Sequence, residues 1–168
     1  MKIQVIDNFF DDYYRIEPEI KKIKLYNNQD FNNTFKVTQQ WPGFRSESIH
    51  TYNPILFHLF IKEFKEKFSW QIPFALELYL HLRLREDQVK DWIHKDEGVQ
   101  LGILVYLNDN LESGTNFYQD NSETPCATIN MVKNRAVLFD SQTNHKSMMN
   151  FGNGLEDGRL TLNGFINF

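Results

Sequence analysis

The stretch Phe74-Ala-Leu-Glu-Leu-Tyr-Leu-His-Leu-Arg-Leu-Arg85 alternates apolar side chains with mostly polar ones. Successive side chains of a β-strand point to opposite faces, so the pattern predicts a strand with one leucine face. The other face carries Tyr79, His81 and Arg83. We expect the leucine face to pack against helices. The polar face then lies either inside a barrel or in solvent, because both arrangements produce the same alternation.

The segments around this strand extend the prediction in both directions. Downstream, strand-like segments at residues 99–107, 115–118, 127–132, 135–139 and 160–168 are separated by turn sequences rich in Asn, Asp and Gly. Upstream, we expect a short strand at residues 3–6, a helical stretch at 11–24 broken or kinked by Pro18, an Asn-rich loop at 27–33, and a helix capped by Asn53-Pro54. Helices followed by strands, without βαβ alternation, predict an antiparallel architecture.

The fold class that fits is mainly β with flanking α helices, as a double-stranded β-helix (jelly roll, cupin-like). With 168 residues, of which 41% are hydrophobic, the chain can bury one core. We therefore expect a single domain over residues 1–168, with helical N-terminal support at about 1–70 and a jelly-roll core at about 71–168.

Composition limits the classes of partner. The net charge is -4, and residues 91–168 carry 5 basic and 10 acidic groups, so a broad nucleic-acid-binding face is unsupported. No apolar run reaches membrane-spanning length, and no secretion signal is evident, so no membrane partner is expected. The single cysteine, Cys126, cannot form an internal disulfide. These features together predict a cytoplasmic protein.

The sequence His94-Lys95-Asp96 suggests a metal site. In extended backbone His94 and Asp96 point to the same side, and a distant His145 could supply a third ligand. Two imidazoles and one carboxylate suit Fe(II) and leave positions open for a chelating cosubstrate and dioxygen. His81 is the one rival ligand, but no carboxylate lies two residues from it.

The last strand carries a second chemical pattern. Arg159 and Thr161 lie two residues apart and therefore share a face, so a guanidinium and a hydroxyl could hold one carboxylate together. The alternative for Arg159 is a surface salt bridge.

These motifs, in this order, resemble the 2-oxoglutarate/Fe(II) dioxygenases, and most closely the prolyl 4-hydroxylase-like enzymes. The resemblance runs from about residue 74 to 168 through His94-Lys95-Asp96, residues 104–108, Ser113-Gly114, residues 134–139, His145 and residues 159–162. Ser113-Gly114 departs from the two glycines usual in the family.

The resemblance implies Fe(II) held by His94, Asp96 and His145, with 2-oxoglutarate as cosubstrate and dioxygen as oxidant. Arg159 and Thr161 would bind the far carboxylate of the cosubstrate, and Tyr106 would add a phenol hydrogen bond. The activity implied is hydroxylation of an unidentified protein side chain or small molecule, with release of succinate and CO2. Asp96 favours hydroxylation, because the halogenating relatives lack this carboxylate.

The substrate and the oligomeric state do not follow from the sequence. Tyr79, Arg83 and Trp92 are candidate substrate contacts, and residues 41–46 are candidates for the substrate entrance, although core anchoring explains these aromatic side chains equally well. A different class remains open: a non-catalytic cupin-like metal- or ligand-binding module in which His94 and His145 hold Zn(II). Structural zinc sites favour four closed ligands, and the sequence offers no fourth ligand or cysteine cluster.

Overall fold

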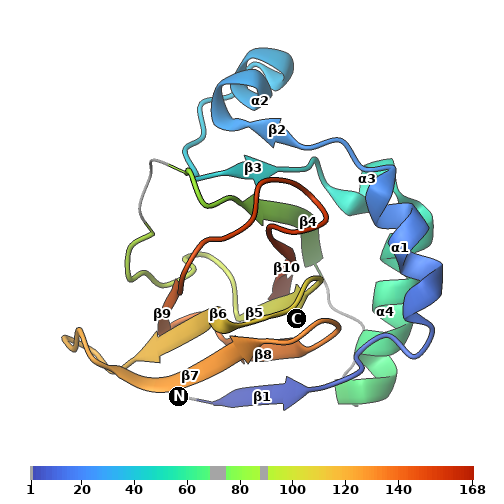
Figure 1. The fold of residues 1–168 in the computed structure, drawn as a ribbon. Coiled ribbons are helices and arrows are strands. Elements are labelled where there is room, and N and C mark those ends of the chain that lie inside the picture. Colours follow the sequence, from blue (N-terminus) through green and yellow to red (C-terminus); the bar gives the residue numbers. More distant parts are fainter. Residues whose placement is uncertain (1, 69–74, 88–90) are drawn as a thin grey trace.

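The computed structural model of the chain describes residues 2–68, 75–87 and 91–168, and within them it contains two β-sheets that face each other (Figure 1). The larger sheet has the order β1 (Ile3–Ile6), β8 (Ala136–Asp140), β5 (Leu101–Tyr106), β10 (Arg159–Asn167), β4 (Ala75–Arg83), β3 (Phe44–Arg45) and β2 (Tyr26–Asn27). The smaller sheet has the order β7 (Pro125–Met131), β6 (Asn110–Tyr118) and β9 (Asn144–Ser147), and all of these strand pairs are antiparallel.

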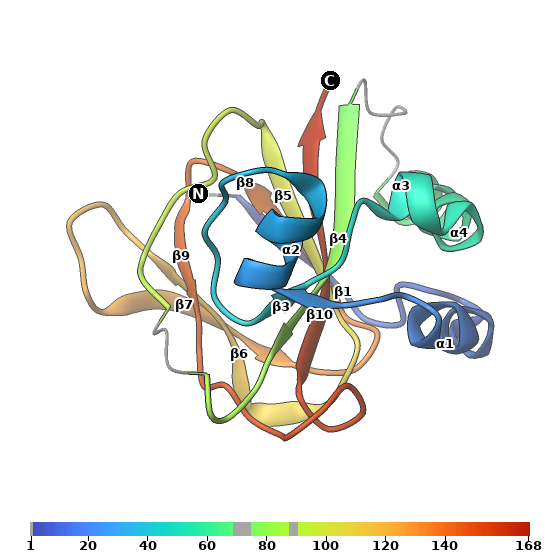
Figure 2. The same cartoon turned by 90° about the horizontal axis from the view of Figure 1, so that it is seen from above.

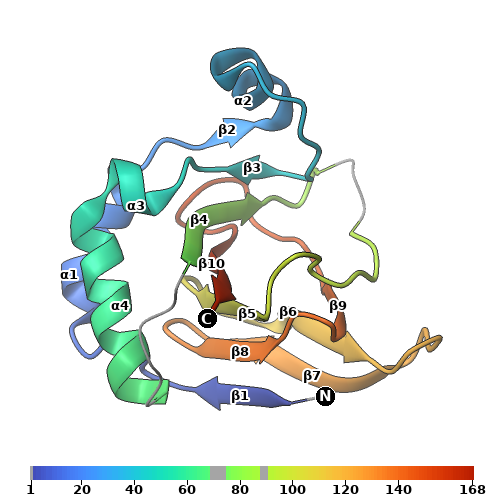
Figure 3. The same ribbon diagram turned by 180° about the vertical axis from the view of Figure 1, so that it is seen from behind.

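Helices cover the outer side of the larger sheet. Figure 2 shows α1 (Tyr13–Lys21), α3 (Ile49–Tyr52) and α4 (Pro54–Phe68) on one side of this sheet and the smaller sheet on the other. Helix α2 (Asn28–Phe35) lies at the end of the molecule where β2 and β3 extend the larger sheet (Figure 3). This layered arrangement confirms the predicted mainly-β fold with flanking helices. No helix in the described ranges is long and apolar enough to cross a membrane.

The longest helix shows how local sequence specifies this packing. The Asn53 side chain accepts a hydrogen bond from the backbone of Leu56 (3.1 Å), and Pro54 occupies the first helical position, as the capping signal predicted. Phe60 and Phe64 are fully buried in one core cluster with the leucine face of β4. Burial of each such side chain contributes about 1.5–3 kcal/mol, so this contact anchors the helical layer to the sheet.

The two faces of β4 behave as its alternation predicted. Leu78, Leu80 and Leu82 join the core under the helices, whereas Tyr79 and His81 line an interior cavity. The prediction that the polar face of this strand lies inside the barrel is therefore confirmed. The alternative, in which this face is exposed to solvent, is wrong. Phe74, at the start of the predicted strand, lies outside the described residues, as do residues 88–90 of the connection that follows it.

Two upstream expectations need correction, and one downstream strand was not predicted. The predicted loop at 27–33 is mostly helix α2, because the Asn27 side chain caps it through Asp30 (2.8 Å) and Phe31 and Phe35 give it an apolar face against Tyr26. Pro18 does not break α1, which continues to Lys21. Strand β9, which carries His145, was not predicted because its four residues show no apolar alternation.

Candidate metal and cosubstrate site

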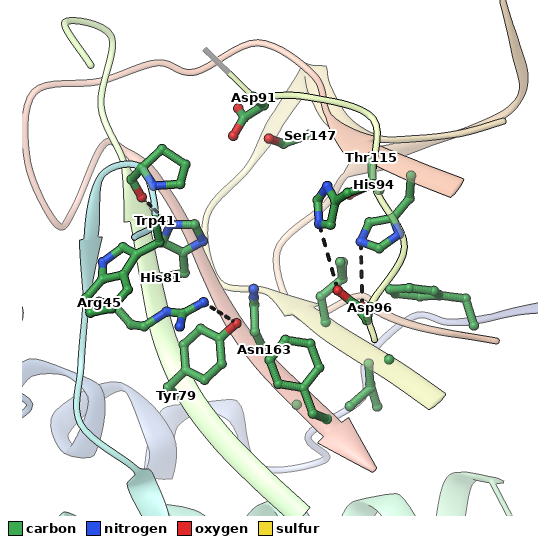
Figure 4. A pocket seen from close by; sticks show the side chains of 18 of the residues that line it. Trp41, Arg45, Tyr79, His81, Asp91, His94, Asp96, Thr115, Ser147 and Asn163 are labelled. Carbon is green, nitrogen blue, oxygen red and sulfur yellow. Dashed lines mark hydrogen bonds and ion pairs between the residues drawn. The ribbon is translucent and has the colours of Figure 1, made fainter. Parts of the chain in front are cut away.

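A cavity of about 200 Å³ lies between the two sheets and contains most of the predicted site residues. Figure 4 shows His94 and Asp96 at one side of it, and Trp41, Arg45, Tyr79 and His81 together at the other. Thr115, Asp91 and Ser147 lie at a third edge, near the His94 side.

His94, Asp96 and His145 converge as predicted. Nε2 of His94 lies 3.8 Å from one carboxylate oxygen of Asp96, and Nε2 of His145 lies 3.7 Å from the other. Two ligand atoms each about 2.1 Å from a common ion can be up to about 4.2 Å apart, so these separations fit one metal ion. The three residues form one of the groups of possible metal ligands within the described part of the chain.

Backbone pairing holds these three side chains in place. His94 and His145 exchange two backbone hydrogen bonds, of 3.0 and 2.9 Å, in an isolated antiparallel bridge. The backbone N–H of Asp96 donates to the carbonyl of Ser141 (2.9 Å), so Asp96 is also held against the segment that leads to His145. The site therefore depends on the pairing of two segments that are far apart in the sequence.

Both imidazoles direct Nε2 toward the Asp96 carboxylate. Nδ1 of His94 lies 3.0 Å from the carbonyl oxygen of Trp92, and Nδ1 of His145 lies 3.0 Å from that of Thr143. A carbonyl oxygen only accepts, so each Nδ1 carries a proton, and the Nε2 of each ring faces Asp96. Burial among aromatic rings lowers the pKa of His145, although Asp96 acts in the opposite direction, and a neutral imidazole is the form that binds a metal.

The predicted cosubstrate residues are only partly gathered at the cavity. Arg159 lines it at 4% exposure, and its Nη2 donates to the carbonyl of Gly114 (3.1 Å). Within the described residues its Nε has no partner. Thr161 and Tyr106 are buried on adjacent strands but do not line the cavity: Thr161 donates to the carbonyl of His81 (3.4 Å), and the Tyr106 hydroxyl bonds to Thr115 (2.9 Å). Thr115 lines the cavity in their place and was not predicted.

Of the three predicted substrate residues, two line the cavity and one does not. Tyr79 and the 54%-exposed Trp92 line the cavity. Arg83 does not: its fully buried guanidinium bonds to Asp87 (2.7 Å) and to Asp91, and so holds the segment that leads to His94.

Among the other residues considered, His81 does not join the metal ligands. Its Nε2 lies 2.7 Å from the carbonyl oxygen of Pro42, and burial lowers its pKa to about 3. The predicted entrance residues Trp41, Pro42 and Arg45 do line the cavity. Sequence reasoning missed Asn163 and Ser147, although each lies two residues beyond a predicted site residue and so shares its face.

No family model matches the chain, and no curated protein matches it in sequence. Solved structures do match it over nearly its whole length. An oxidoreductase of the 2OG-Fe(II) oxygenase family from Burkholderia pseudomallei superposes with a TM-score of 0.63 at 10% identity, covering 98% of this chain and 84% of that one.

Two further solved structures also superpose on nearly the whole chain. HygX from Streptomyces hygroscopicus, solved with nickel and 2-oxoglutarate bound, gives a TM-score of 0.68 at 12% identity and covers 98% of this chain and 82% of its own. A prolyl hydroxylase from Trichoplax adhaerens, in complex with a hypoxia inducible factor peptide fragment, gives 0.62 at 12% identity, with 98% and 83% covered. The chain has the fold of the 2-oxoglutarate and Fe(II) oxygenases. At these identities the likeness establishes the jelly-roll fold and not the reaction.

Proposed function

We propose that this protein is a 2-oxoglutarate- and Fe(II)-dependent oxygenase that hydroxylates a substrate. The observation that carries the proposal is the convergence of His94, Asp96 and His145, with both Nε2 atoms within 4 Å of the carboxylate, in a cavity that also contains the buried Arg159. A facial set of two imidazoles and one carboxylate with open positions is typical of non-haem Fe(II) oxygenases. The metal and 2-oxoglutarate bound to HygX, which has the same fold, support the assignment.

The donor set fits Fe(II), and His94, Asp96 and His145 would hold it. When bound, the iron would supply the activation of dioxygen that oxidises a substrate C–H bond. In the overall reaction 2-oxoglutarate loses CO2 and becomes succinate, with one oxygen atom of O2 entering succinate and the other entering the substrate as a hydroxyl group.

The chain's own residues would position the two organic reactants. The Arg159 guanidinium would pair with the far carboxylate of 2-oxoglutarate, because it is buried and, among the described residues, its one hydrogen bond goes to the carbonyl of Gly114. Thr115, which follows the Gly114 that Arg159 contacts, also lines the cavity and would add a hydroxyl. Tyr106 would act indirectly, by orienting Thr115 through their 2.9 Å hydrogen bond. Thr161 pairs with Tyr106 on the neighbouring strand and would support this part of the larger sheet.

A second candidate is a non-catalytic metal-binding module. Within the described residues the group of possible ligands around His94 contains only His94, Asp96 and His145, whereas a structural zinc site is usually closed by four. The open set favours the enzyme.

Turnover distinguishes these two candidates. We would add Fe(II), 2-oxoglutarate and air to the protein and measure succinate and O2 consumption, since many such sites oxidise the cosubstrate slowly without substrate. The proposal predicts succinate formation that is lost in Asp96→Ala and kept in Asp12→Ala, an exposed aspartate before α1 that does not line the cavity. Equal succinate from both variants would refute it, as would the absence of both succinate and the visible charge-transfer band of a chelated iron and 2-oxoglutarate complex in the unaltered protein.

The Trichoplax enzyme holds a peptide, so a protein target is one class of substrate to test alongside small molecules. A cytoplasmic location remains part of the proposal, supported by the single cysteine and by the advantage of a reducing compartment for ferrous iron.

A further inference from the structure

The side of the cavity opposite His94 is built around Arg45. We call Trp41, Arg45, Tyr79 and Asn163 the Arg45 corner; Figure 4 shows all four side chains. The Arg45 guanidinium lies over the Tyr79 ring at 3.9 Å and over the Trp41 ring at 4.8 Å. Its Nη2 donates to the Tyr79 hydroxyl at 2.8 Å. Aromatic rings therefore contact the faces of the guanidinium, and a ligand would reach it through its N–H edge.

Arg45 has no acidic partner in the described part of the chain. Its one hydrogen bond there goes to Tyr79, and no carboxylate lies within ion-pair distance of it. Arg83, on the neighbouring strand, differs because its guanidinium is bonded to both Asp87 and Asp91. A partly buried guanidinium is costly unless an anion compensates its charge. Arg45 is thus placed to receive an anionic group from outside the chain.

Other polar atoms of the corner are also unsatisfied. Trp41 Nε1, Arg45 Nε and Asn163 Oδ1 are buried without a hydrogen-bond partner among the described residues. His81 adds an acceptor, because its Nε2 donates to Pro42 and its neutral ring leaves Nδ1 unprotonated. Donors on Trp41 and Arg45 suit a carboxylate, and the oxygen of Asn163 suits an N–H or O–H on the same ligand.

The corner is closed in a way that limits the size of its ligand. The turn before β3 passes so close to β4 that a Cβ on Gly43 (φ +75°) would lie 2.4 Å from the carbonyl oxygen of Leu82. The whole cavity measures about 200 Å³. Ligand cavities are commonly about 300–1,000 Å³, so this one fits a compact molecule beside the cosubstrate.

We propose that the Arg45 corner binds the carboxylate of a small acid, such as a free amino acid or hydroxy acid, and presents that molecule to the metal site as the substrate. The carboxylate pairs with Arg45, while Arg159 pairs with 2-oxoglutarate. This inference rests on the proposed function, which it deepens by naming a substrate class.

The test compares acids with their amides. The common free L-amino acids and short hydroxy acids, each beside its carboxamide, are titrated into the anaerobic protein with Fe(II) and 2-oxoglutarate, and shifts of the visible charge-transfer band are recorded. At least one acid is expected to bind ten- to a hundredfold more tightly than its amide, the usual worth of a charge-assisted hydrogen bond. Arg45→Gln abolishes that preference and leaves the 2-oxoglutarate band in place, Arg45→Lys restores part of it, and Arg15→Gln, on exposed α1, changes nothing.

Each other outcome is decisive. Equal binding of every acid and its amide, or tighter binding of end-capped acidic peptides than of free acids, overturns the inference while leaving the proposed function intact. Loss of 2-oxoglutarate affinity in Arg45→Gln would show that the roles of the two arginines are reversed. Calorimetric titration of the same acids into the metal-free protein measures the carboxylate preference even if no band forms, so the failure of the proposed function is separable from the failure of this one.

Discussion

At the scale of single residues, the site combines ligands that are held by their backbone with arginines that differ in their partners. His94 and His145 owe their orientation to the carbonyls of Trp92 and Thr143. Arg83 is neutralised by two aspartates, whereas Arg159 bonds only to a carbonyl within the described residues. Buried arginines of the same sheet therefore serve different purposes, one structural and one available to a ligand.

Arg159→Gln is expected to weaken 2-oxoglutarate binding by ten- to a hundredfold, because it removes a charge-assisted bond to the far carboxylate. Metal affinity should stay within about twofold, since Arg159 is not among the ligand group. Titration of the charge-transfer band with 2-oxoglutarate, beside a separate metal titration, measures both. A parallel loss of metal binding would mean that Arg159 acts through the fold.

His81 predicts a pH dependence of stability. Burial lowers its pKa from 6.5 to about 3, so between these values the unfolded chain binds a proton that the folded chain excludes. The contribution of His81 to the free energy of unfolding is therefore fully present above about pH 6.5 and decreases as the pH falls toward 3. Because the ring is partly exposed to the cavity, we expect this contribution to fall by roughly 1–2 kcal/mol by about pH 4.5.

Denaturant unfolding of the protein and of His81→Gln at several pH values measures that contribution. The glutamine amide can still donate to the carbonyl of Pro42 but does not titrate, so its curve should be flatter between pH 6.5 and 4.5. Parallel curves would show that His81 gains its proton in the folded state as readily as in the unfolded one.

At the scale of elements, β5 brings a glycine against Asp96, one of the proposed metal ligands. A Cβ on Gly102 would lie 2.6 Å from the Phe139 ring and 3.1 Å from Oδ2 of Asp96. Gly102→Ala should therefore displace the carboxylate and lower metal affinity about ten- to a hundredfold, the range seen when the groups supporting a ligand are altered. Gly154→Ala is the control, because its nearest contact would be 3.8 Å away. Metal titration by calorimetry compares the two, and equal affinities would contradict this role for Gly102.

Helix α4 stabilises the larger sheet without touching the cavity. Phe64→Ala should lower the free energy of unfolding by about 3–5 kcal/mol, because it empties a fully buried position between the helix and the sheet. Ile55→Ala, on the same helix at 56% exposure, should cost much less. Denaturant unfolding measures both, and metal affinity of the folded protein should be unchanged in each.

Sequence pattern was informative for elements where one face is buried. The leucine alternation of β4 and the Asn53-Pro54 cap predicted their elements because each depends on neighbouring residues alone. Strand β9 and the inner position of Thr115 depend on pairing with distant segments, which no local pattern encodes. Helix α2 was missed because its stability comes from Phe31 and Phe35 packing on Tyr26, and not from the intrinsic preference of its asparagines.

At the scale of the whole molecule, the fold places two chemically different groups on opposite sides of one small cavity. The smaller sheet and the segment bearing His94 supply the candidate metal ligands, and β3 and β4 of the larger sheet supply Arg45 and Tyr79. The helices stabilise the larger sheet from outside, so the interior face remains free for polar side chains (Figure 2).

The most direct test of this account is a crystal structure of the protein grown without oxygen, with Mn(II) as an iron substitute and 2-oxoglutarate. Anomalous scattering should locate one ion bound by Nε2 of His94, Nε2 of His145 and the carboxylate of Asp96, with the far carboxylate of 2-oxoglutarate on Arg159. An ion bound elsewhere, or the diacid bound away from Arg159, would contradict the account.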